Sequence, residues 1–224
     1  MPTSHKPCLK AIGFDLDGTL VDTERMHYDI YKHAMRKHGK DLPFEVFKNM
    51  CGMSGVDGAK FLIKHFDLDF DPVEFDPLKD HDSNEIFHNA HIKPMLFADS
   101  VLSGCAQDDV PFYIVTSSPF DVATKKLSRA RLSGYVGNRL ITPSMGLRSK
   151  PHPDMYHKAI ELLKIEPAEL YVIEDTALGV QSAIDAGCFP VAVPSMYTLE
   201  QDFSHAKVVF KDIREAVEYF HHHP

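Results

Sequence analysis

The chain has 224 residues, of which 44% are hydrophobic and 25% charged, ordinary figures for a soluble globular protein with room for one large domain or a core with an inserted subdomain. Its net charge of -8 argues against nucleic acid or an anionic membrane surface as the main partner, although a local site can still bind a small anion. The apolar runs are too short to span a bilayer, and the N-terminal stretch lacks the apolar region of a signal peptide. The four cysteines form no C-x-x-C pair. We therefore expect a protein of the reducing cytoplasm.

The first predicted element is a strand at residues 9–14, and two carboxylates, Asp15 and Asp17, follow it at once. Two like charges this close repel each other, and each raises the pKa of the other. A fold accepts that cost most readily when a positive group lies between them. The alternative is a plain hairpin turn at Asp17 and Gly18, with residues 9–16 and 19–21 as its arms.

Residues 21–94 form a helical block with no convincing strand. The first predicted helix covers residues 23–38, with Thr23 as its N-cap and Gly39 as its stop. The acidic, turn-rich segment 67–82 is expected to link helices of the block. We therefore expect an insertion at 21–94 in a core made of residues 1–20 and 95–224. The further helices predicted in the block are 44–49, 56–65 and 83–91.

From residue 95 to the end, short β-rich runs alternate with helical patterns. This alternation predicts an α/β fold, with a mainly parallel, Rossmann-like sheet and helices on both faces. The predicted strands of the whole chain are 9–14, 112–115, 139–141, 170–173, 189–193 and 207–210. The predicted helices of this part are 120–131, 153–164, 178–186 and 213–220.

Polar residues stand just after four of the predicted strands. In open parallel sheets, ligands bind beyond the carboxyl ends of the strands, so these residues are expected to converge on one edge. Each group also has an ordinary explanation when it is taken alone: a solvated loop lysine, or acids at a helix start. In chain order the groups are Asp15, Asp17 and Thr19, then Thr116, Ser117, Ser118 and Pro119, then Arg148, Lys150 and Pro151, then Glu174, Asp175 and Thr176.

Acids, hydroxyls and a lysine at one edge suit a phosphoryl group. Carboxylates from Asp15 and Asp175 are suitable ligands for Mg²⁺, which would neutralise the acidic cluster. The stretch 118–121 is expected to open a helix, with Ser118 as N-cap, and a helix N-terminus offers N–H groups to phosphate. The Thr116 hydroxyl and the Lys150 ammonium add a donor and a full charge. Transfer of a phosphoryl group needs mainly such positioning and charge stabilisation.

Four motifs of the sequence, FDLDGTLVDTE, VTSS, SKPHPD and VIEDT, resemble those of the haloacid dehalogenase-like hydrolases, in the order of that family. The core resemblance covers about two thirds of the chain, and the helical insertion looks like the family's α-helical cap. Within the superfamily, the chain is most similar to the β-phosphoglucomutase and sugar-phosphate phosphatase branch.

The resemblance implies a role for each matching residue. Asp15 would be the nucleophile that becomes an aspartyl-phosphate, and Asp17 the acid that protonates the leaving group and then activates water. Mg²⁺ would be bound by Asp15, the backbone carbonyl of Asp17 and Asp175, with Glu174 supporting or ligating. The residues implied to bind the substrate are Thr116 and Lys150 for the phosphoryl oxygens, backbone N–H groups near Ser117, and His27 on the first cap helix.

The sequence also departs from the resemblance. Sugar-phosphate mutases of this branch carry an arginine after the Gly-x-Ser of the cap loop, where this chain has Gly55. Asp17 argues against dehalogenase activity, because that branch lacks the second acid. No lysine in residues 50–60 is placed for the Schiff-base chemistry of the phosphonate-cleaving relatives.

We therefore predict a Mg²⁺-dependent phosphatase of small phosphorylated metabolites, sugar or polyol phosphates, acting as a monomer or weak dimer without nucleic acid or membrane. The alternative is a phosphomutase of the β-phosphoglucomutase kind. A third hypothesis is a signalling receiver domain, which also combines an aspartate, a hydroxyl, a lysine and Mg²⁺. Receivers place their phosphoacceptor after the third strand, whereas Asp15 follows the first.

Overall fold

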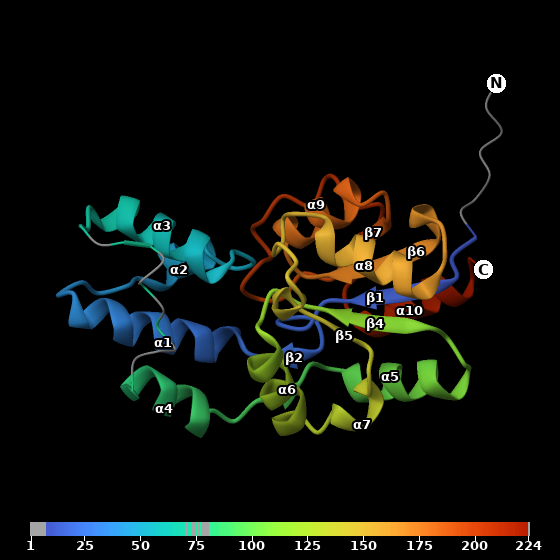
Figure 1. The fold of residues 1–224 in the computed structure, drawn as a ribbon, viewed down its shortest axis with the longest axis horizontal. Coiled ribbons are helices and arrows are strands. Elements are labelled where there is room, and N and C mark those ends of the chain that lie inside the picture. Colours follow the sequence, from blue (N-terminus) through green and yellow to red (C-terminus); the bar gives the residue numbers. More distant parts are fainter. Residues whose placement is uncertain (1–7, 70, 73–74, 76, 78–80, 224) are drawn as a thin grey trace.

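The computed structural model describes residues 8–69, 71–72, 75, 77 and 81–223, and a five-stranded sheet lies at its centre (Figure 1). The strand order is β5-β4-β1-β6-β7, and every neighbouring pair is parallel, which confirms the predicted α/β class. The strands are β1 (Ala11–Phe14), β4 (Phe112–Val115), β5 (Leu140–Ile141), β6 (Leu170–Glu174) and β7 (Phe189–Ala192).

The sheet is buried on both faces, because successive side chains of a strand point to opposite sides. On β6, Tyr171 and Ile173 belong to one hydrophobic cluster, whereas Leu170 and Val172 belong to another. The strands therefore read as continuous apolar runs, without the polar alternation of a half-exposed sheet.

Helices cover the two faces of the sheet. Helices α8 and α9 contribute to the cluster that contains Leu170 and Val172, and α5, α6 and α10 contribute to the cluster on the other face. The helices of this part are α5 (Ala98–Gln107), α6 (Phe120–Arg129), α7 (Ser133–Val136), α8 (Asp154–Leu163), α9 (Ala177–Asp185) and α10 (Ile213–His221), with the short turns η2 (Pro143–Met145) and η3 (Pro167–Glu169).

The predicted helical block gathers at one end of the molecule, on the left of Figure 1. It has a hydrophobic cluster of its own, which includes Tyr28, Phe47 and Leu62. Gly39 follows the first helix with a φ of 69°, as expected of a helix stop. The helices are α1 (Glu24–Lys37), α2 (Phe44–Lys48), α3 (Gly55–Phe66) and α4 (His81–Asn89).

Two short strands that we did not predict join the block to the rest of the chain. Strand β2 (Val21–Asp22) and strand β3 (Lys93–Pro94) pair antiparallel, at the points where the chain enters and leaves the helices. Two residues are too short a run for any hydrophobic period to be seen. The expected linking segment 67–82 falls partly outside the described residues, at 70, 73–74, 76 and 78–80.

The structure differs from the predictions at two other places. The strand predicted at 207–210 is wrong: Val209 forms only an isolated bridge with Ala192, and its side chain is 54% exposed. Helix α5 was not predicted, because Asp99, Ser103 and Gly104 weaken its helical propensity. Packing of its apolar face against the sheet overrides that preference. Helix α7, a single turn, was also missed.

Within the described part of the chain, no helix combines the length and apolar character needed to cross a membrane. Residues 1–7, which make up most of the stretch used to argue against a signal peptide, lie outside that part. The four cysteines carry free thiols, with Cys8 exposed and the other three buried.

Candidate active site

The four strand-end groups meet at the carboxyl edge of the sheet, as the sequence predicted. A cavity of about 780 Å³ lies there, between the sheet and the helical block. Helix α1 contributes His27 to its wall from the block side. From the sheet side it is lined by Asp15, Asp17, Thr116, Ser117, Lys150 and Asp175.

At this wall lies a buried trio of carboxylates, Asp15, Glu174 and Asp175, whose ligand oxygens lie within 4.8 Å of one another. Pairing of β1 with β6 brings them together, since the Asp15 N–H donates to the Ile173 carbonyl at 3.0 Å. Lys150 Nζ lies 2.5 Å from Asp15 Oδ1 and 2.6 Å from Glu174 Oε1. Three carboxylates against this one ammonium leave two negative charges.

The trio fits a divalent cation, whose two positive charges would balance the two negative charges left by Asp15, Glu174, Asp175 and Lys150. Burial raises the pKa of Asp15 and of Asp175, and the neighbouring carboxylates raise both further. Both side-chain oxygens of Asp175 are buried without a hydrogen-bond partner among the described residues. Gly18, with a φ of 80°, leaves the space that the Asp175 carboxylate occupies, and a side chain there would collide with it. Unpartnered buried oxygens of this kind are what a hard metal ion binds.

Glu174 is held by more protein groups than the other two carboxylates. Besides Lys150, the Tyr156 hydroxyl donates to Glu174 Oε1 at 2.5 Å. Asp15 and Glu174 raise the pKa of Lys150 above its ordinary value, against the effect of its burial. The lysine is therefore fixed as an ammonium, and it also donates to the Val115 carbonyl at 2.8 Å.

Asp17 has a different environment from Asp15. Its Oδ1 accepts from the Thr23 hydroxyl at 2.5 Å and from Lys126 Nζ at 2.6 Å, and its Oδ2 accepts from the Ser118 hydroxyl at 2.9 Å. Although burial opposes the shift, the Lys126 ammonium and the Thr23 hydroxyl lower the pKa of Asp17. The two carboxylates thus have pKa values moved in opposite directions, the arrangement that separates two roles in one active site.

Two hydroxyls that we predicted as helix caps bind Asp17 instead. Thr23 occupies the N-cap position of α1, but its side chain makes no capping hydrogen bond. Helix α6 begins at Phe120, with Pro119 and not Ser118 at its N-cap position, so the predicted N-cap is wrong by one residue. A hydrogen bond from a hydroxyl to an ionised carboxylate is stronger than a neutral capping bond, which favours the orientation of both hydroxyls toward Asp17.

The remaining predicted residues lie as follows. Thr116 is 1% exposed, and its Oγ1 accepts from the Ser118 N–H at 3.0 Å. The Ser117 hydroxyl is buried without a partner in the described part of the chain. Arg148 also lines the cavity, but it is exposed and forms two hydrogen bonds with Asp154, at 2.7 and 2.8 Å.

Sequence reasoning missed Lys126, which is 1% exposed and lies at the centre of the Asp17 contacts. The pattern of the predicted helix at 120–131 already marks this lysine as unusual. Ala123 and Leu127 mark the buried face of α6, and a lysine at position 126 falls on that apolar stripe. A lysine is rarely buried unless a carboxylate pairs with it.

Contacts between the helical block and the sheet side lie beside the cavity, which Cys51, Gly52 and Thr176 help to line. The loop at Gly52 lies against Thr176, which begins α9, and Gln201 Nε2 donates to the Cys51 carbonyl at 3.2 Å. Lys48 of α2 forms an ion pair with Glu200 at 2.9 Å. The block thus contacts the segment that follows the Glu174–Asp175 pair.

Gly52→Ala should disturb this contact. The added Cβ would lie 2.9 Å from the Thr176 Cβ, at a φ of 91° that disfavours alanine. We expect the free energy of unfolding to fall by about 1–3 kcal/mol and kcat/KM to fall roughly 10- to 100-fold. Gly39→Ala is the matched control, because Gly39 has a φ of 69° but no neighbour within 4 Å of the new Cβ. Equal effects of the two variants on kcat/KM would contradict a role for the Gly52 contact.

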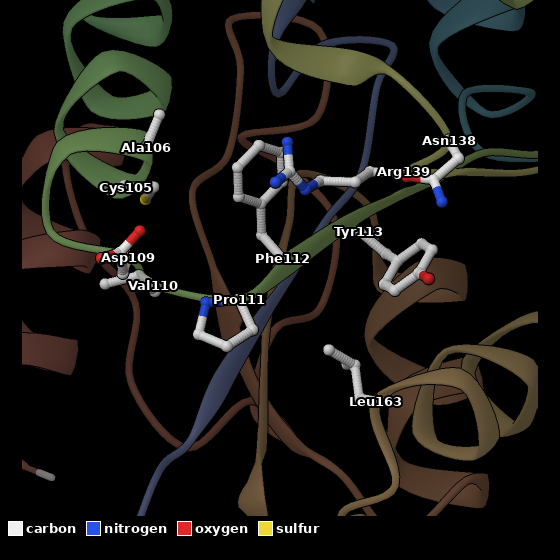
Figure 2. Close-up of a pocket in the computed structure, with 10 residues that line it drawn as sticks. All are labelled: Cys105, Ala106, Asp109, Val110, Pro111, Phe112, Tyr113, Asn138, Arg139 and Leu163. Atoms are coloured by element: carbon white, nitrogen blue, oxygen red, sulfur yellow. The ribbon is translucent and has the colours of Figure 1, made fainter.

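A second cavity, of about 310 Å³, lies at the other edge of the sheet, around the start of β4 (Figure 2). Arg139 lies over the ring of Phe112, with its guanidinium carbon 5.0 Å from the ring centroid. Among the described residues of the lining, Asp109 is the only carboxylate. The cavity therefore lacks the converging acids and hydroxyls of the first one.

The chain is similar to known proteins in sequence and in fold. A family model described as haloacid dehalogenase-like hydrolase matches residues 12–193. Hexitol phosphatase A of Escherichia coli is 31% identical over 186 residues, which cover 82% of each chain. A probable pseudouridine-5'-phosphatase of Drosophila melanogaster is 28% identical over 207 residues, 90% of this chain and 89% of that protein. A crystal structure of a hydrolase of the same family from Deinococcus radiodurans, with bound phosphate and sodium, superposes with a TM-score of 0.74 at 25% identity, over 96% of this chain and 97% of that one.

Proposed function

The chain belongs to the haloacid dehalogenase-like hydrolases and is a phosphoric monoester hydrolase, and we propose that it hydrolyses sugar or polyol phosphates, with Mg²⁺, through an aspartyl-phosphate on Asp15. The names of the two relatives, a hexitol phosphatase and a probable pseudouridine-5'-phosphatase, point to phosphate esters of polyhydroxylated alcohols, which supports this substrate class. The observation that carries the proposal is the pair Asp15 and Asp17, one buried and one partly buried carboxylate, held by different partners at one cavity.

In the proposed reaction, Asp15 and Asp17 act in two steps. Lys150 holds Asp15 Oδ1, so Oδ2 attacks the phosphorus, and the bond between phosphorus and the leaving oxygen breaks. Asp17 gives a proton to that oxygen. A water then attacks the phosphorus of the aspartyl-phosphate, Asp17 takes its proton, and the bond to Asp15 breaks. Asp17 must therefore carry that proton before the first step and is left ionised after it; its three hydrogen-bond donors stabilise this carboxylate, the form that the second step requires.

The metal would be bound by Asp15, Asp175 and the backbone carbonyl of Asp17. Glu174, already held by Lys150 and Tyr156, would support the site and need not supply a ligand itself. Bound Mg²⁺ would supply charge neutralisation of the trio and of the phosphoryl oxygens. The unpartnered oxygens of Asp175 are the observation that favours this assignment.

The phosphoryl oxygens would be bound from the other side by Thr116, the backbone N–H groups at Ser117, and Lys150. Thr116 and Lys150 are both buried at the cavity wall, where water screens their charge and dipoles least. His27 belongs to the helical block, and its Nε2 lies 4.0 Å from Asp17 Oδ1. We assign it a contact with the substrate near the leaving oxygen.

We also propose that residues 21–94 are a cap domain on a core of residues 1–20 and 95–224. The β2–β3 pair at the junctions and the separate hydrophobic cluster of the block support this division. Closure of such a cap would exclude water until the aspartyl-phosphate forms. The free cysteines are consistent with the proposed cytoplasmic location, and we propose a monomer or weak dimer.

Phosphate release from a panel of phosphorylated metabolites, with and without Mg²⁺, tests the proposal. We expect sugar and polyol phosphates to rank first, with release only when Mg²⁺ is present. Interconversion of sugar-phosphate isomers without release of phosphate would contradict it and favour the phosphomutase. Against that alternative, Gly55 stands in the cavity wall where mutases carry an arginine, and nothing lies within 4 Å of its Cβ position.

A further inference from the structure

Lys126 is a buried lysine that the proposed chemistry leaves without a role. We propose that Lys126 is a positioning residue for the reaction, which fixes the Asp17 carboxylate toward the leaving oxygen and ties that carboxylate to His27 of the helical block. This inference rests on the proposed function, because it concerns the acid and base of that reaction.

All three N–H groups of the Lys126 ammonium have an acceptor. Nζ lies 2.6 Å from Asp17 Oδ1, 2.9 Å from Ser118 Oγ and 3.0 Å from His27 Nε2. An ammonium has three donors and no acceptor, so His27 Nε2 must be the unprotonated nitrogen of its ring. No donor remains for a substrate, and the side chain is 1% exposed. Lys126 therefore acts through its three partners.

A charge is not needed here to build helix α6. Its buried face consists otherwise of small and aliphatic residues such as Ala123 and Leu127, and a methionine at position 126 would fill similar space. Taking an ammonium out of water costs free energy, which replacement by an apolar residue often avoids. The neighbouring Lys125 is about half exposed and lies 3.9 Å from Asp121, so the helix also carries an ordinary solvated lysine. The buried lysine is thus explained by its contacts and not by helix packing.

The contacts of Lys126 connect three parts of the molecule. Asp17 follows β1, Ser118 follows β4, and His27 belongs to α1 of the helical block. Ser118 accepts from Lys126 and donates to Asp17 Oδ2, so one cluster holds both carboxylate oxygens. Thr23 and Ser118 remain in a Lys126 variant, but the charged contact and the link to His27 are lost. Asp17 then has more than one orientation at the leaving oxygen and at the attacking water.

Lys126→Met tests the role with two esters and with Lys125→Met as the matched control. For the sugar phosphate that the wild type hydrolyses fastest, we expect the first turnover to slow roughly 100-fold, since its alkoxide needs a proton from an Asp17 that is held toward it, and the variant loses that orientation. KM should stay within about threefold of the wild type, because Lys126 has no donor for the substrate. Lys125→Met should match the wild type.

With p-nitrophenyl phosphate, the same variant should show a burst. The phenolate leaves without a proton, so the first equivalent of nitrophenol should appear at a rate within about fivefold of the wild type. Steady turnover should then be slow, because hydrolysis of the aspartyl-phosphate still needs Asp17 as a base. Equal losses for the two esters in the first turnover, no loss at all, or the same loss in Lys125→Met would overturn the inference.

Lys126→Arg keeps the test decisive if Lys126→Met fails to fold. The guanidinium keeps the charge, but its planar fork cannot reproduce the three contacts of an ammonium. We expect a folded protein with the same burst and a loss of roughly tenfold for the sugar phosphate. Wild-type rates for both esters in Lys126→Arg would overturn the inference. A wild type that releases no phosphate from any ester would overturn the proposed function and this inference together, whereas an active wild type with an unaffected Lys126→Met would overturn the inference alone.

Discussion

Replacing Asp15 by asparagine should lower kcat by at least roughly 10⁴-fold, because an amide oxygen or nitrogen does not form the acyl-phosphate bond that the carboxylate forms. The fold should remain, since the amide has the same shape and can still accept from Lys150. Burial raises the pKa of Asp15 above its value in the unfolded chain, so the ionised group destabilises the metal-free fold at neutral pH. The variant should therefore unfold at the same temperature as the metal-free wild type or above it. Phosphate release and thermal unfolding measure the two effects.

Asp109→Asn is the control for this variant, because Asp109 lies at the second cavity, across the sheet from the site. It should leave kcat unchanged. If Asp15→Asn kept more than about one hundredth of the wild-type kcat, the nucleophile would have to be another group. If it lost the native circular dichroism spectrum, the carboxylate would be needed for folding, contrary to the raised pKa of Asp15.

Removal of divalent metal with EDTA should abolish phosphate release, and Mg²⁺ should restore it and stabilise the fold. At a Mg²⁺ concentration 100 times its Kd, the stabilisation is about 2.7 kcal/mol, which corresponds to a rise in Tm of roughly 5–10 °C for a chain of this length. The raised pKa values of Asp15 and Asp175 mean that both carboxyls hold protons more tightly in the folded protein. Their contribution to stability is therefore present at low pH and is lost as the pH rises through those pKa values. Bound Mg²⁺ replaces these protons, so the rise in Tm should be larger at pH 8 than at pH 5.

Asp175→Asn separates the metal from a general effect of salt. It removes the carboxylate whose oxygens have no partner among the described residues, so the rise in Tm with Mg²⁺ should largely disappear. Glu169→Gln, on the turn η3, removes a carboxylate that pairs with Lys10 and should leave the response unchanged. An equal response of Asp175→Asn and the wild type would place the metal elsewhere.

The strand-end residues could be predicted because they depend on one rule of topology. Parallel strands end at the same edge, so Asp15, Thr116 and Asp175 had to meet once the strands were recognised. Lys150 lies nine residues beyond β5, so the topology rule made it a candidate for phosphate binding, and the resemblance to a family implied the same role. The structure brings it to Asp15.

The hydroxyls and the buried lysine around Asp17 could not be predicted in the same way. Local sequence offers Thr23 and Ser118 a capping role, and the competing carboxylate is adjacent only in the folded chain. Lys126 is 109 residues from Asp17, and its place on the apolar stripe of α6 marks it as unusual without naming its partner. Helix α5 shows the same limit of local preference, because its packing against the sheet outweighs its weak propensity.

The place of β1 in the middle of the sheet has a consequence for local unfolding. With β4 and β6 paired to its two sides, its amides should exchange with solvent only when the whole sheet opens, together with the N–H of Asp15 itself. The outer strands β5 and β7 and the helical block can fray or move without exposing that strand. We therefore expect the proposed nucleophile to belong to the last part of the molecule to unfold, and the cavity residues of the helical block to belong to parts that open at lower free energy.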